Sequence, residues 1–294
     1  MNSELNVRTI VWFRENDLRV SDHEPLLAGA DHGEVIPLFV LDSRRFAPER
    51  AQARAHSTQY LLEALQALDN SLRSRGSRLV VLKGKPDDVI VRVADEWRAD
   101  RVVAQRSANP QRRSVDARIA RLLGERFRLF GGETLATPAT VLTAAGTSYR
   151  VFSQYARTFE QAIEVPVPQR PPTRLNRPPS SVFAETVAIP TCPELGIERN
   201  RSLIRGGEDA AHLRLARTAE SVVQNYADSR DRMDLATTSR LSADLRFGCV
   251  SPRQVWRAIR TELPESESAS SFLRQLVWRE FSHDILWHRP DVMT

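Results

Sequence analysis

Five short runs of apolar and β-branched residues are spaced through the first half of the chain. Two of them, Val35–Leu41 and Leu79–Lys83, read VIPLFVL and LVVLK and lack the alternation of a strand with one solvated face. Such uninterrupted runs are typical of strands that are buried on both faces. The other three runs are Thr9–Phe13, Arg101–Gln105 and Phe127–Phe130. The pattern therefore predicts five buried strands.

Segments with apolar residues at helical spacing separate the later strands. They are Thr58–Arg75, Pro86–Trp97, which begins with proline followed by two aspartates, and Gln111–Leu123. Strands that alternate with helices favour a parallel sheet, here over about 130 residues. No GxGxxG sequence follows the first strand, so the ordinary dinucleotide-binding fingerprint is absent.

The second half of the chain has a different organisation. The proline-rich stretch Val165–Pro190 suits neither a helix interior nor a central strand and indicates a long surface connection. Helical periodicity then continues through Glu208–Tyr226, a segment starting at Ser251-Pro252, and Ser271–Phe281, with Trp256 expected in the core. We therefore expect an α/β domain over residues 1–135, a connector over 136–205 and a helical domain over 206–294.

The segment Tyr226–Gly248 contains a candidate anion site. Thr238 or Ser239 suits a helix N-cap, which would place Arg240 and Ser242 in the first turn. Free backbone N–H groups, hydroxyls and a guanidinium together suit a phosphate or pyrophosphate. An ordinary capped helix explains the same pattern.

The charge balance permits a nucleic-acid partner. The chain has 294 residues, a formal net charge of +5 and a sequence pI near 9.7, with the excess carried by arginine. Arginine suits phosphate contacts, although a coding bias toward arginine accounts for it equally well. The chain has only two cysteines, no apolar run long enough for a membrane span and no signal sequence at its start. We therefore expect a cytoplasmic protein.

Three motifs resemble those of the photolyase/cryptochrome family. They are TSRLS at 238–242, QLVWREF at 275–281 and TIVWFRENDLRVSDHEPL at 9–26, supported by SYRVFSQYARTF at 148–159. The TSRLS segment looks like the bacterial class I form that acts on cyclobutane pyrimidine dimers (CPDs). The resemblance implies a parallel, Rossmann-like antenna domain followed by an all-helical FAD-binding domain.

The resemblance also implies roles for individual residues. Gln275 and Trp278 match the residues that contact the lesion, and Arg230 matches a DNA-phosphate contact. For Trp278 a buried core position, and for Arg230 a solvated surface position, are the alternatives. The residues implied for the flavin cofactor are Tyr226, Thr238, Ser239, Arg240, Leu241, Ser242, Phe272, Gln275 and Arg279.

The activity implied is that of a deoxyribodipyrimidine photo-lyase, in which reduced FAD transfers an electron to a CPD in damaged DNA under blue light. Because Gln275 stands where many members have glutamate, a (6-4) lesion stays open as the substrate. A cryptochrome-like blue-light receptor, or a flavin-free homologue that acts as a binding scaffold, is the alternative. No metal is expected.

Arg14, Asp17, Arg19 and Asp22 follow the first strand, where the family has a loop that supports an antenna chromophore, a deazaflavin or a folate. A solvated, mutually paired set of charges is the alternative. The chain ends shortly after the WREF motif, which suggests an incomplete flavin pocket that a C-terminal half or a second chain would complete. In that case Phe272 and Leu276 would be exposed.

Overall fold

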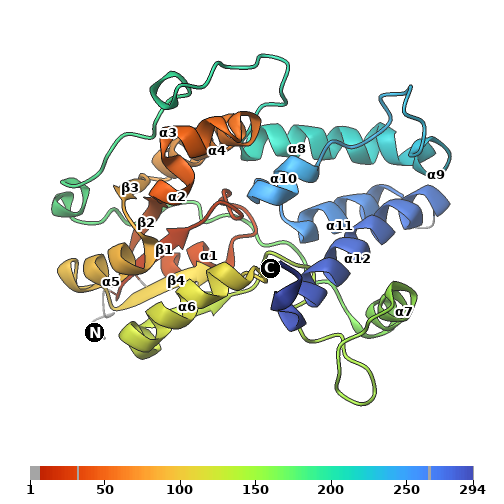
Figure 1. The fold of residues 1–294 in the computed structure, drawn as a ribbon, viewed down its shortest axis with the longest axis horizontal. Helices are drawn as coiled ribbons and strands as arrows, with labels where there is room; N and C mark the ends of the chain where they lie inside the picture. The colour runs from red at the N-terminus through yellow and green to blue at the C-terminus, as the bar shows by residue number, and fades with distance from the viewer. Residues whose placement is uncertain (1–6, 32, 264–265, 294) are drawn as a thin grey trace.

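The computed structural model describes residues 7–31, 33–263 and 266–293. A parallel sheet forms the centre of the first part, on the left in Figure 1. Its order is β3-β2-β1-β4-β5, and every pair is parallel, as predicted. The strands are β1 (Val7–Phe13), β2 (Gly33–Leu41), β3 (Val80–Lys83), β4 (Arg101–Gln105) and β5 (Phe127–Phe130).

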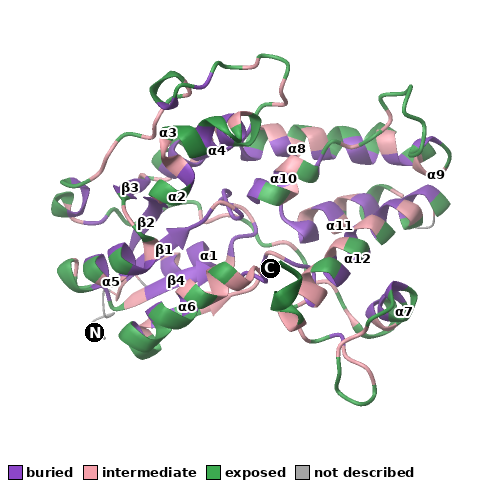
Figure 2. Ribbon diagram, in the orientation of Figure 1, coloured by how far each residue is buried: buried purple, intermediate pink, exposed green. Residues whose placement is uncertain are grey.

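Helices cover both faces of this sheet. Alternate residues of β1 enter two separate hydrophobic clusters, with Val11 and Phe13 in one and Ile10 and Trp12 in the other. Both faces are therefore buried (Figure 2), which explains the uninterrupted apolar runs. The helices of this part are α1 (Glu24–Ala30), α2 (Ser43–Phe46), α3 (Pro48–Gln52), α4 (Ala55–Arg73), α5 (Pro86–Glu96), α6 (Pro110–Leu123) and the 3-10 turn η1 (Gly124–Arg126).

The second part is helical, on the right in Figure 1. It comprises α7 (Phe152–Ala162), α8 (Glu208–Arg217), α9 (Tyr226–Ser229), α10 (Ser242–Phe247), α11 (Pro252–Glu262) and α12 (Glu267–His288), with 3-10 turns η5 (Val223–Asn225) and η6 (Pro290–Met293). The 3-10 turns η2 (Ser180–Phe183) and η3 (Pro193–Leu195) belong to the connector and pack on the α/β part. No helix in the described ranges is both long and apolar enough to cross a membrane.

The predicted helix over Glu208–Tyr226 is not a regular α-helix throughout. After α8 the chain forms a π turn, η4 (Thr218–Val222), and then η5. The hydroxyls of Thr218 and Ser221 donate to the carbonyls four residues earlier, Arg214 and Arg217. Bonds of this kind compete with the helical backbone pattern and often bend it.

The proline-rich connector runs along the α/β part. Val187 N donates to Val81 O of β3 at 2.9 Å, and Leu175 N donates to Arg75 O at 2.8 Å. One hydrophobic cluster contains residues of both parts, such as Leu61 of α4 and Phe247 of α10. The domain limits at 135 and 206 stay a prediction.

Candidate functional site

The charged loop after β1 is buried between the two parts of the molecule. Arg19 is 1% exposed, and it donates to the backbone carbonyls of Asp22, Gly132 and Gly248 and to Gln105 Oε1. Burial lowers the pKa of the Arg19 guanidinium. The interpretation of this loop as a solvated set of charges is therefore wrong. A buried charge persists here because all three guanidinium nitrogens donate to oxygen acceptors.

Carboxylates fix the same loop to the helical part. Glu208, in the first turn of α8, accepts from Val20 N at 2.8 Å and Ser21 N at 2.9 Å. Asp22 accepts from Arg253 Nε of α11 at 3.1 Å and from the hydroxyl of Ser251. These contacts set the position of α8 and α11 relative to the sheet.

A second set of buried carboxylates comes from α12. Glu280 Oε2 accepts from Leu135 N at 2.8 Å and Ala136 N at 3.2 Å, and Asp284 Oδ1 accepts from Ala139 N at 3.2 Å. Burial raises the pKa of Glu280 to about 7, against the opposing effect of the Arg279 charge and the two backbone N–H groups. Sequence reasoning missed these residues, because the sequence of a mostly apolar helix does not show which backbone groups a carboxylate within it will bind.

Gln275 and Trp278 lie one turn apart on α12, near its partly open face. Trp278 is 44% exposed, which contradicts its interpretation as a core residue. Its ring stacks on Phe152 of α7, with centroids 3.5 Å apart and planes 10° apart. Gln275 is half-buried, and its side chain has no hydrogen-bond partner within the described ranges. The pair therefore presents a flat aromatic surface next to a free amide.

Tyr226 and Phe272 pack together where α9 meets α12. Their ring centroids are 5.1 Å apart at an interplanar angle of 75°, and burial raises the pKa of Tyr226. Phe272 and Leu276 are 6% and 4% exposed, so the expectation that they would be exposed is wrong. Arg230, at the end of α9, is exposed and lies 3.5 Å from Asp231 Oδ2.

The TSRLS segment adopts a different local structure from the one predicted. Helix α10 begins at Ser242, after an N-cap, Leu241, that makes no side-chain capping bond. Arg240 precedes the helix in the left-handed region, with φ of 56°. The N-cap prediction for Thr238 or Ser239 is therefore wrong. Burial of Leu241 and the 3.4 Å bond from Leu241 N to Ser239 Oγ define a turn before the helix starts.

The donor set of this segment nevertheless suits a phosphate. Thr238 and Ser242 are exposed, and the Arg240 guanidinium makes no ion pair within the described part of the chain. A free guanidinium with adjacent hydroxyls matches the charge and geometry of phosphate oxygens. Arg279 differs, because its Nη1 donates to Glu133 O at 2.7 Å and thus faces the α/β part.

The predicted site residues therefore fall into separate groups. Tyr226, Arg230 and Phe272 meet at the α9–α12 contact, whereas Gln275 and Trp278 lie farther along α12. Among the described residues, no hydrogen bond joins the TSRLS segment to Gln275 or Arg279.

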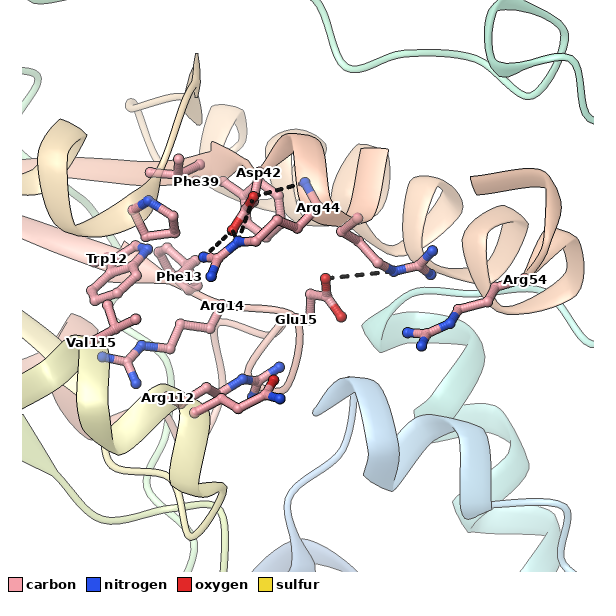
Figure 3. A pocket seen from close by; sticks show the side chains of 14 residues that line it. Trp12, Phe13, Arg14, Glu15, Phe39, Asp42, Arg44, Arg54, Arg112 and Val115 are labelled. Atoms are coloured by element: carbon pink, nitrogen blue, oxygen red, sulfur yellow. Dashed lines mark hydrogen bonds and ion pairs between the residues drawn. The ribbon is translucent and has the colours of Figure 1, made fainter. Parts of the chain in front are cut away.

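A basic pocket of about 270 Å³ lies where β1 and β2 end (Figure 3). Of the loop residues that the family resemblance assigned to an antenna chromophore, it contains Arg14. Arg44 pairs with Asp42 at 2.5 Å, and Arg45 lies 3.6 Å from Glu15. Burial lowers the pKa of Arg112. The arginines that line the pocket are Arg14, Arg44, Arg45, Arg54 and Arg112. In parallel sheets, ligands usually bind at the carboxyl ends of the strands. This rule, applied to the predicted strands, could have located the pocket from the sequence.

A parallel α/β unit tied by buried charges to a helical unit defines a protein of the photolyase–cryptochrome type. The chain belongs to the DNA photolyase family, whose model matches residues 9–173. It is 31% identical to a deoxyribodipyrimidine photo-lyase of Agrobacterium fabrum over 293 residues, which cover 96% of this chain and 60% of that protein.

Two further comparisons extend this result. The crystal structure of a bacterial class III photolyase from Agrobacterium tumefaciens is similar with a TM-score of 0.85 and 30% identity, over 99% of this chain and 61% of that one. An uncharacterized 31.6 kDa protein of Synechococcus is 29% identical over 92% of this chain and 98% of its own length. The chain thus spans about 60% of the length of the photolyases it matches, and the finer resemblance to class I enzymes stays a prediction.

Proposed function

We propose that this chain takes part in the light-dependent repair of CPDs in DNA, with FAD as the cofactor. Because the chain spans about 60% of the length of its photolyase relatives, the activity is proposed for the chain together with the part those relatives add. Family membership and the arrangement of Gln275 and Trp278 on α12 support the proposal.

The observation that carries the proposal is the half-exposed indole of Trp278. A fully buried indole would contribute to the hydrophobic core, but 44% of the Trp278 surface is exposed to solvent. Stacking on Phe152 fixes the orientation of the indole ring. An open, fixed aromatic face suits stacking with a base that has left the duplex, and damaged bases are the cheapest to extrude. Gln275, one turn away, can donate to a pyrimidine carbonyl or accept from a pyrimidine N–H.

For the cofactor, Arg240 with the hydroxyls of Thr238, Ser239 and Ser242 would hold the FAD phosphates, and Tyr226, Leu241 and Phe272 would contribute apolar surface. When bound, reduced FAD supplies the light-driven electron transfer on which dimer splitting depends. Arg279 has a different role in this proposal, because it joins α12 to Glu133. It would fix the helix that carries Gln275 and Trp278.

The basic pocket at the end of β1 and β2 is the proposed antenna site. Five arginines and two carboxylates line it, with Arg44 paired to Asp42 and Arg45 near Glu15, whereas the Arg14 guanidinium pairs with Asp116. Trp12 and Phe39 add aromatic surface (Figure 3). This lining favours an aromatic chromophore that carries negative charge, a requirement that both a deazaflavin and a folate meet.

The cofactor part of the proposal is tested with a chain extended by the C-terminal segment of the Agrobacterium fabrum relative. Arg240→Ala removes a charge-assisted contact worth about 1.5–3 kcal/mol and should weaken FAD binding roughly ten- to hundredfold in a fluorescence titration. Arg232→Ala is the matched control, since Arg232 lies in the same segment but already pairs with Asp234. Equal FAD affinity of the wild type and Arg240→Ala would remove the phosphate role of Arg240.

A further inference from the structure

A groove between α7, the connector and α11 lies outside both proposed sites. Its volume is about 270 Å³. Helix α11 lines it with Trp256, Arg257 and Arg260, and apolar side chains come from α7 and the start of the connector. These apolar residues are Phe159, Ile163 and Val165. The groove therefore combines a hydrophobic surface with a basic one.

Two of the three arginines that α11 contributes to this groove, Arg257 and Arg260, carry positive charge that no ion pair within the described residues compensates. Arg253, Arg257 and Arg260 occupy positions i, i+4 and i+7 of α11 and so share one face of the helix. Like charges at this spacing destabilise a helix by a few tenths of a kcal/mol each. Within the described residues neither Arg257 nor Arg260 forms an ion pair, nor does Glu160, the carboxylate in the lining. An anion bound here would relieve the repulsion.

Arg253, the buried arginine of the same helix face, also favours binding of an anion in the groove. Its Nε pairs with Asp22 at 3.1 Å and its Nη1 with Glu24 at 2.6 Å. Its Nη2 is buried and has no hydrogen-bond partner within the described part of the chain. A buried N–H group without an acceptor, in a residue that lines the groove, increases the attraction for negative charge.

Trp256 supplies a surface for a ring. It was expected in the core, but it is only half-buried, because one side packs against Phe159 at 6.0 Å and 67° while the indole also borders the groove. The guanidinium carbon of Arg260 lies 5.3 Å from the indole centroid. The guanidinium thus lies over the indole in a cation–π contact, so an aromatic surface and a positive charge adjoin each other in the groove lining.

We propose that this groove binds a small aromatic anion of the mononucleotide class, with its ring against Trp256 and its phosphate on Arg257 and Arg260. The volume lies just below the roughly 300–1,000 Å³ of small-molecule sites, which favours one ring system with one phosphate over a dinucleotide. The inference does not depend on the repair activity proposed above.

The test is calorimetric titration of the chain with adenosine 5′-monophosphate, with adenosine and inorganic phosphate as the probes that lack charge or ring. We expect the mononucleotide to bind at least tenfold more tightly than either partial probe. The double substitution Arg257→Gln/Arg260→Gln should weaken its binding at least tenfold, and Trp256→Phe should weaken it less. Arg121→Gln, at an exposed arginine of α6, is the control and should bind as the wild type does.

Arg54→Gln separates this groove from the basic pocket at the sheet edge. Mononucleotide binding that falls with Arg54→Gln and survives the double substitution would overturn the proposal, as would binding no tighter than that of phosphate or no binding at millimolar concentration. The substituted arginines are exposed, and an unchanged circular dichroism spectrum confirms that the variants are folded.

Discussion

Replacing Glu280 with glutamine tests how the helical part is held to the α/β part. The Glu280 side chain is 2% exposed, and its Oε2 accepts from the backbone of Leu135 and Ala136. Burial raises its pKa from the ordinary 4.5 to about 7. The folded protein therefore keeps a proton on this carboxyl over a pH range in which the unfolded chain has lost it.

The sign and size of the effect follow from this difference. Between pH 4.5 and about 7 the folded state binds more protons than the unfolded state, so the free energy of unfolding falls as the pH rises. At about 1.4 kcal/mol per pH unit, the full loss above pH 7 is roughly 3 kcal/mol. Glutamine preserves the carbonyl oxygen that accepts the two N–H groups but does not titrate.

The assay is urea denaturation of the wild type and Glu280→Gln at pH 5, 6, 7 and 8. The variant should gain stability relative to the wild type by roughly 2–3 kcal/mol between pH 5 and 8, because part of the effect already lies below pH 5. Glu125→Gln, at an exposed glutamate, is the control and should follow the wild type at every pH. A difference between the wild type and Glu280→Gln that is the same at pH 5 and pH 8 would refute the reasoning.

Two further predictions concern DNA. Trp278→Ala removes a stacking surface, so it should cost about 1–3 kcal/mol in binding to CPD-containing DNA and little in binding to undamaged DNA. Both affinities are measured by fluorescence anisotropy, and the control Trp97→Ala, in the α/β part, should not alter their ratio. For undamaged DNA, the logarithm of the binding constant should fall linearly with the logarithm of the salt concentration, with a slope near −0.9 per phosphate contact. Arg230→Gln should reduce the magnitude of that slope by about 1. A binding constant that does not change with salt would exclude this electrostatic mode.

The sheet could be predicted because each strand is recognisable from its own short run of residues. The run Arg101–Gln105 coincides with β4, since a strand buried on both faces needs apolar residues at nearly every position. The run Phe127–Phe130 coincides with β5, but this edge strand is not buried as predicted, because only Phe127 is buried and Arg128 is exposed. The first turns of α5 and α11 were predictable for a similar local reason, because proline fits at the start of a helix.

The failures arose where a distant partner decides the local structure. A solvated position was the alternative for Arg19, and it is wrong because acceptors from Gly132 and Gly248, far away in the sequence, make its burial favourable. At TSRLS the hydroxyls suggested a cap, yet burial of Leu241 places the start of α10 at Ser242. The candidate lesion residues were located by motif resemblance, whereas the exposure of Trp278 depends on Phe152 of α7 and required the structure.

Photorepair of a defined substrate tests the central claim most directly. A single-stranded oligonucleotide with one CPD is incubated with FAD under reducing conditions and with the chain extended by the C-terminal segment of the Agrobacterium fabrum relative. Dimer loss is followed by chromatography in blue light and in the dark. The account predicts loss of the dimer only in the light, and a strong decrease with Trp278→Ala. An extended protein that binds FAD and the CPD oligonucleotide but leaves the dimer intact in the light would contradict it.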